Sequence, residues 1–178
     1  KLHDDDVYVA SKIPKPEVNG PAVTEVTIEN NNVHVYFQLW QKNPRIILSD
    51  GTYQEPVIAY MLLVDSDFNY IASISKAEMS LCIEQTLKKG TYYLVTDINY
   101  RYANNGKILG YNISSYASEE VSLELVTRTV QPGPIIEKAV TQYAKKNLTP
   151  SKESGGAVTS YISKAYSKDW PFVIALFE

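Results

Sequence analysis

Alternating apolar and polar residues recur through positions 23–126, and this pattern constrains the fold more than any other feature of the sequence. The runs are short, rich in β-branched and aromatic residues, and separated by turn-forming Asn, Asp, Gly and Pro. Such a series is typical of an antiparallel sandwich or barrel, and the absence of an intervening helical period argues against a parallel βαβ sheet. We expect about eight strands, at residues 23–29, 33–40, 57–64, 70–75, 81–87, 91–98, 108–117 and 121–126.

The turns between these runs predict how neighbouring strands connect. Asn30-Asn31-Asn32 separates the first two runs, and asparagine tolerates positive φ, so we expect a hairpin there. Residues 57–64 are apolar throughout, which predicts a buried strand. Asp65-Ser66-Asp67 then turns this strand into residues 70–75.

The two ends of the chain have a different composition from the strand series. Residues 1–22 form an N-terminal segment with three prolines and one short apolar run. Residues 135–146 place apolar side chains at helical spacing and end on two lysines, which predicts a short amphipathic helix. We therefore divide the chain into an N-terminal segment (1–22), a β-sandwich (23–130), and a helix, linker and start of a further unit (131–178) that ends on an extra strand.

Composition excludes several classes of protein. The chain has 178 residues, 44% of them hydrophobic and 21% charged, which is enough to bury the core of one domain. The net charge of −3 argues against a general nucleic-acid binder, and no run approaches the length of a membrane-spanning helix. A single cysteine and the lack of an apolar signal core favour a cytoplasmic or other intracellular location.

The sequence does not place a nucleophile beside a base. Cys82 lies between Leu81 and Ile83, and we expect it to be a small buried hydrophobe. His34 alternates with Val33 and Val35, so it faces away from them. No cofactor is expected and no catalytic residue is assigned, because no zinc-ligand spacing and no glycine-rich phosphate loop is present.

Calcium is the candidate metal. Asp65 and Asp67 supply two hard oxygen ligands at one turn, and sandwich domains often present such turns at one end. Two aspartates at a turn are also ordinary turn chemistry, because the Asp side chain bonds to the backbone two residues on.

Two polar stretches are candidate interaction sites. The strand 33–40 ends in Gln41-Lys42-Asn43-Pro44-Arg45, and Pro44 has no N–H with which to continue a ladder. We expect residues 41–45 to leave the sheet and to expose two cations to a partner. Tyr100-Arg101-Tyr102 offers a second exposed surface of aromatic and cationic side chains.

Four segments of the chain resemble the β-sandwich domain that follows the protease core in calpains. They occur in the same order as in that family and together span about residues 24–120. Residues 39–45 resemble its Leu-Met-Gln-Lys-Asn-Arg-Arg segment, 57–60 its Ile-Gly-Phe strand, 87–95 its Leu-x-x-Gly-x-Tyr-x-x-Val strand, and 103–116 its last turn and strand. The chain departs from the family where the arginine of the last strand is replaced near Asn112, and where no acidic loop is evident.

The resemblance implies a non-catalytic regulatory domain. Its partner would be the protease core or another protein, and its parent a calpain-like cysteine endopeptidase, a hydrolase. The residues assigned to this interaction are Gln41, Lys42, Asn43, Arg45, Tyr100, Arg101 and Tyr102. The alternative function is a calcium-dependent module that binds anionic phospholipid through Asp65 and Asp67.

Overall fold

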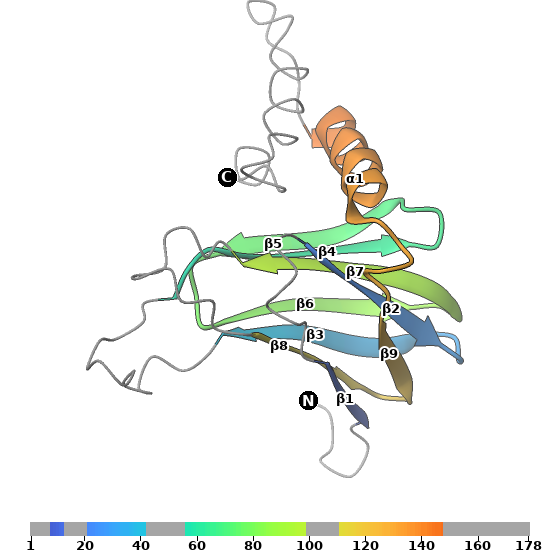
Figure 1. Ribbon diagram of the computed structural model, residues 1–178. Helices are drawn as coiled ribbons and strands as arrows, with labels where there is room; N and C mark the ends of the chain where they lie inside the picture. Colours follow the sequence, from blue (N-terminus) through green and yellow to red (C-terminus); the bar gives the residue numbers. More distant parts are fainter. Residues whose placement is uncertain (1–7, 13–20, 42–55, 99–110, 148–178) are drawn as a thin grey trace, which may run out of the picture.

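The computed structural model describes residues 8–12, 21–41, 56–98 and 111–147, which hold nine strands and one helix (Figure 1). Their bounds are β1 Tyr8–Lys12, β2 Ala22–Ile28, β3 Val33–Gln41, β4 Ala59–Asp65, β5 Tyr70–Lys76, β6 Ser80–Leu87, β7 Gly90–Ile98, β8 Tyr111–Ala117, β9 Val121–Leu125 and α1 Pro132–Asn147. The strands form two antiparallel sheets, sheet A in the order β1-β8-β3-β6 and sheet B in the order β5-β4-β7-β2-β9. The all-β sandwich with a short helix is thus confirmed, whereas the extra strand expected near the C-terminus lies outside the described residues.

Strand alternation builds the core between the two sheets. In β3, every second side chain from Val33 to Gln41 is buried and the residues between them are half-buried or exposed. Phe37 and Leu39 of sheet A pack in one cluster with Met61, Leu63 and Leu94 of sheet B. Because apolar surface removed from water stabilises the fold by about 25 cal/mol per Å², this largely apolar interior is the main support of the sandwich.

Sheet B is apolar on its outer face as well, and α1 covers that face (Figure 1). Six of the seven residues of β4 are buried, which confirms the buried strand predicted from its continuous apolar run. The helix residues Ile135, Ile136, Ala139 and Val140 are buried in a second cluster with Val23, Tyr60, Leu62, Val64 and Val95. The helix therefore shares a core with the sandwich, across the boundary that the sequence placed after residue 130.

The connection between β2 and β3 differs from the predicted hairpin. β2 pairs with β7 and β9 in sheet B, whereas β3 pairs with β6 and β8 in sheet A, so the hairpin prediction was wrong. Asn32 has φ 63, which permits the tight reversal that the asparagines indicated. The chain therefore crosses from sheet B to sheet A at this turn. Both strands direct apolar side chains into the interior between the two sheets.

The N-terminal segment and the Asp65–Asp67 turn also contribute to the sheets. The short run in the N-terminal segment forms β1, which pairs with β8 along its whole length and extends sheet A. The turn after β4 leads directly into β5, with Phe68 at φ 64, and β4 and β5 pair antiparallel with a register shift between Leu63 and Val64. In the described ranges, no helix has the length and apolar character needed to span a membrane.

Leu94→Ala should lower the free energy of unfolding by roughly 2–5 kcal/mol, because Leu94 is fully buried between the sheets and its truncation leaves a cavity. The measurement is urea denaturation followed by circular dichroism. The matched control is Leu125→Ala, since Leu125 is 37% exposed at the end of β9 and its loss should cost less than half as much. Equal effects of the two substitutions would contradict the assignment of Leu94 to the core.

Candidate functional site

Gln41 does not leave the sheet as the sequence predicted. It is the last residue of β3, it pairs with Tyr111 of β8, and its side chain is buried. The side-chain amide donates to the carbonyl oxygens of Val57 (2.6 Å) and Glu78 (2.8 Å), and its oxygen accepts from the Val57 N–H (3.1 Å). The prediction that Gln41 leaves the sheet is therefore wrong, because its buried amide bonds to the backbone groups of Val57 and Glu78.

The other predicted interaction residues lie outside the described residues: Lys42, Asn43, Arg45, Tyr100, Arg101 and Tyr102. The strands that flank them are described, and they end close together. Gln41 pairs with Tyr111, Ile98 pairs with Ala59, and the Thr96 hydroxyl lies 3.0 Å from that of Tyr111 across the two sheets. The end of β3, the start of β4, the end of β7 and the start of β8 thus lie at the same end of the sandwich.

Asp65 organises the β4–β5 turn. One carboxylate oxygen accepts from the N–H groups of Asp67 (2.9 Å) and Asn69 (2.8 Å), and the other accepts from the Asn69 amide (2.8 Å). These are the contacts of a turn-stabilising aspartate. Among the described residues, no group of three or more His, Cys, Asp or Glu side chains is gathered where it could hold a metal ion.

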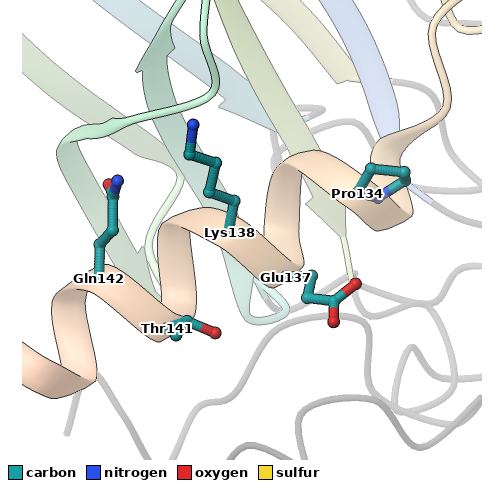
Figure 2. A pocket seen from close by; sticks show the side chains of 5 residues that line it. All are labelled: Pro134, Glu137, Lys138, Thr141 and Gln142. Atoms are coloured by element: carbon teal, nitrogen blue, oxygen red, sulfur yellow. The ribbon is translucent and has the colours of Figure 1, made fainter.

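The same turn is fastened to α1. The Lys138 ammonium donates to the backbone oxygen of Asp67 (2.6 Å), while Gln142 accepts from the Tyr70 N–H (2.8 Å) and donates to the Asn69 side chain (2.7 Å). Figure 2 shows both side chains rising from the helix toward this turn, with Glu137 and Thr141 directed away from it. A hollow of about 440 Å³ is lined by Pro134, Glu137, Lys138, Thr141 and Gln142. Lys138 and Gln142, two of the polar side chains that line this hollow, therefore attach α1 to the β4–β5 turn.

Cys82 is exposed, so the prediction that it is buried was wrong. Leu81 and Ile83 face the core, and the side chain between them points to the outer face of β6, which is an edge strand of sheet A. Partial desolvation raises the pKa of the Cys82 thiol, which opposes formation of the nucleophilic thiolate; a hydrogen bond with Gln38 acts in the other direction. His34 pairs with Thr86 rather than with Cys82, so the two side chains do not form a nucleophile–base pair.

The outer face of sheet A carries a patch of aromatic and polar side chains, which we call the aromatic face. It comprises Val9, His34, Tyr36, Gln38, Trp40, Cys82, Glu84 and Tyr116. The register aligns four of them across all four strands, with Val9 beside Tyr116, Tyr116 beside Tyr36 and Tyr36 beside Glu84. Two of these side chains are clearly exposed to solvent, since Trp40 is 42% and Val9 is 60% exposed.

Hydrogen bonds order the aromatic face. Glu84 accepts from the Tyr36 hydroxyl (3.0 Å) and lies 3.1 Å from His34 Nε2, while the rings of His34 and Tyr36 meet edge to face at 4.9 Å. The Trp40 indole N–H donates to Gln38 (3.1 Å). The hydrogen bond to Glu84 raises the pKa of Tyr36, with smaller contributions from desolvation and from the negative charge of Glu84. Sequence alternation placed His34 on this face, but the pairing with β6 and β8 that assembles the patch is long-range.

Asp97 is the one described carboxyl with a strongly raised pKa. It lies on the outer side of β7, across from Tyr60, and one of its oxygens accepts from the Ile98 N–H (2.9 Å). Burial raises its pKa to about 7, against a smaller lowering by that hydrogen bond. The shift indicates a carboxyl that the folded protein holds partly protonated near neutral pH.

No protein-family model and no curated protein matches the chain. The resemblance to calpains therefore stays a prediction from the four segments that carry it.

Gln41→Leu should lower the free energy of unfolding by about 1–3 kcal/mol, because it leaves the buried N–H and carbonyl of Val57 without their partner. Urea denaturation measures the change. Gln38→Leu is the matched control, since Gln38 lies on the solvent side of the same strand. If Gln41→Leu is no more destabilising than Gln38→Leu, the buried hydrogen bonds of Gln41 do not contribute to stability as we expect.

Asp97 should make the protein less stable as the pH rises from about 4 to 7. The native state holds a proton that the unfolded chain has already lost, so stability falls across this window and is constant above and below it. At about 1.4 kcal/mol per pKa unit the loss is on the order of a few kcal/mol. Asp97→Asn should remove it, as measured by unfolding at pH 5 and pH 8, whereas Glu124→Gln at an exposed position of β9 should leave the slope unchanged. A slope that survives Asp97→Asn would assign the effect to other groups.

Proposed function

We propose that this chain is a non-catalytic interaction domain of a calpain-like cysteine protease, which docks on the protease core or on another protein. The aromatic face is the observation that supports it. Of the two outer sheet faces, that of sheet B packs against α1, and that of sheet A presents exposed Trp40 together with half-buried Tyr36 and Tyr116. Tyr and Trp are enriched at the energetic centres of protein interfaces because they bury a large area and keep a polar handle.

The interior supports a binding role rather than an enzymatic one. The space between the sheets is filled by aliphatic and aromatic side chains, and the hydroxyls of Thr96 and Tyr111 bond to one another there. Cys82 and His34 share a face but have different partners, as Cys82 pairs with Gln38 and His34 with Glu84 and Thr86. A nucleophile requires a base within hydrogen-bond reach, and neither side chain supplies one to the other.

The alternative is a calcium-dependent phospholipid module, and it depends on Asp65 and Asp67. The Asp65 oxygens already accept three hydrogen bonds within the turn, so a calcium ion would have to compete with them. Calcium titration in the presence of vesicles of phosphatidylserine separates the functions. Vesicle binding that requires calcium and is lost on Asp67→Asn would replace the proposed function with the alternative.

Lys42→Glu combined with Arg45→Glu should leave the domain folded and weaken its binding to the protease core encoded by the same gene. The prediction rests on the segment 39–45, which resembles a calpain segment and carries these two cations. Exposed ion pairs contribute only ~0–1 kcal/mol to folding, so we expect these two cations to position a partner rather than to stabilise the domain. The melting temperature and the affinity for the core are the measurements.

The matched control reverses two charges at the end of the sandwich opposite Gln41, with Lys88→Glu and Lys89→Glu in the exposed turn before Gly90. This control should bind the core as the unmodified chain does. Equal weakening by both double variants would show a general effect of net charge, and loss of a cooperative melt in the first would show that residues 42 and 45 are structural.

A further inference from the structure

The two sheets have chemically different outer faces. Sheet B directs aliphatic side chains such as Val23, Leu62 and Val95 outward, and the apolar side of α1 covers them. On β3 and β6, sheet A directs aromatic, amide, hydroxyl and carboxylate side chains outward, and these remain half-buried or exposed. A face of this composition is stable in water and also offers rings to a partner, so it does not require a permanent cover.

The row of four aligned side chains across sheet A changes from apolar at one end to acidic at the other. It begins at the exposed aliphatic Val9 on β1, continues over the rings of Tyr116 and Tyr36, and ends at the carboxylate of Glu84 on β6. Neighbouring strands lie about 4.8 Å apart, so the row is ~14 Å long, which matches four or five residues of extended chain. His34 and Trp40 flank the row along β3.

Glu84 is the one acidic side chain on this face among those that the structure describes, and it is 56% exposed. No described Lys or Arg accompanies it, and its basic neighbour is His34, whose Nε2 lies 3.1 Å away. Tyr36 and His34 both contact the same Glu84 oxygen. The second oxygen receives no hydrogen bond from the described residues, so it is available to a donor from outside.

We propose that the aromatic face binds a basic, extended segment of a partner protein, with arginine side chains over Tyr36 and Tyr116 and against Glu84. This inference rests on the proposed function and gives the chemical class of the partner. Arginine suits the face because its planar guanidinium stacks on aromatic rings and also donates two parallel hydrogen bonds to a carboxylate.

Charge complementarity favours this occupant over the others. An acidic segment would bring a second carboxylate to Glu84, and an anionic membrane would meet a face on which the described side chains supply no Lys or Arg. A second copy would present the same acidic face to itself. A basic segment satisfies the carboxylate and the rings together.

The test measures the affinity of the full chain for two labelled ten-residue peptides, alternating Ser-Arg and alternating Ser-Glu, by fluorescence anisotropy at low ionic strength. We expect the arginine peptide to bind and the glutamate peptide not to bind. Glu84→Gln should weaken the arginine peptide about tenfold, and Tyr36→Ala by a similar factor. Tyr36→Phe keeps the ring and should lose less affinity than Tyr36→Ala.

Glu124→Gln is the matched control, because it removes the same charge from an exposed position on β9 of the other sheet. It should bind the arginine peptide as the unmodified chain does, and circular dichroism should show native melts for all variants. Equal weakening by Glu84→Gln and Glu124→Gln, binding of the glutamate peptide, or no binding of either peptide would overturn the inference. So would phosphatidylserine-vesicle binding, or self-association in analytical ultracentrifugation, that Glu84→Gln abolishes.

The proposed function fails by a different result. If the arginine peptide binds at Glu84 but the gene encodes no cysteine-protease core, the aromatic face is a basic-peptide site in a protein of another family. If the core is present and binds, and the arginine peptide does not, the proposed function holds and this surface is not its basic-peptide site.

Discussion

Sheet B has apolar side chains on both faces, and the rest of the structure depends on this constraint. Six consecutive residues of β4 are buried, so alternate side chains need two separate cores. Sheet A supplies one of them and α1 supplies the other. A sandwich of two sheets alone would leave Leu62, Val64 and Val95 in water, at a cost of about 1.5–3 kcal/mol for each large side chain. The helix is therefore part of the folding unit.

The same constraint explains how the helix is attached. Apolar packing fixes the distance of α1 from the sheet but not its position along it, since aliphatic contacts have little directionality. Lys138 and Gln142 fix the position of α1 along the sheet, because they hydrogen-bond to the β4–β5 turn. The rings of Tyr143 and Tyr70 also contact each other there, with centroids 5.1 Å apart. Asp65 holds that turn in shape through its own three hydrogen bonds. Its carboxylate is thus used by the fold, whichever ligand the domain binds.

Strand positions could be predicted from the sequence because alternation is a local property. The eight expected strands all exist, and the helix is where its 3.6-residue period placed it. Three features were missed, and two of them, the Asn30–Asn32 turn and Gln41, depend on long-range pairing. The Asn30–Asn32 turn looked like a hairpin, since sequence cannot tell a reversal within a sheet from a crossing between sheets. Cys82 looked buried because its neighbours are apolar, although their parity puts it outside. Gln41 looked like a loop residue because its partner, Val57, is sixteen positions away.

The aromatic face illustrates the same limit and shows why it matters for function. Parity within β3 places His34, Tyr36, Gln38 and Trp40 on one side, and this much is readable from the sequence. The carboxylate that gives the patch its charge is 48 positions from Tyr36 along the chain, and Tyr116 comes from a third strand. A surface of this kind arises from the order β1-β8-β3-β6, in which β3 is an interior strand with both neighbours in register. The pairing of the strands brings these side chains together, and the sequence of each strand supplies only some of them.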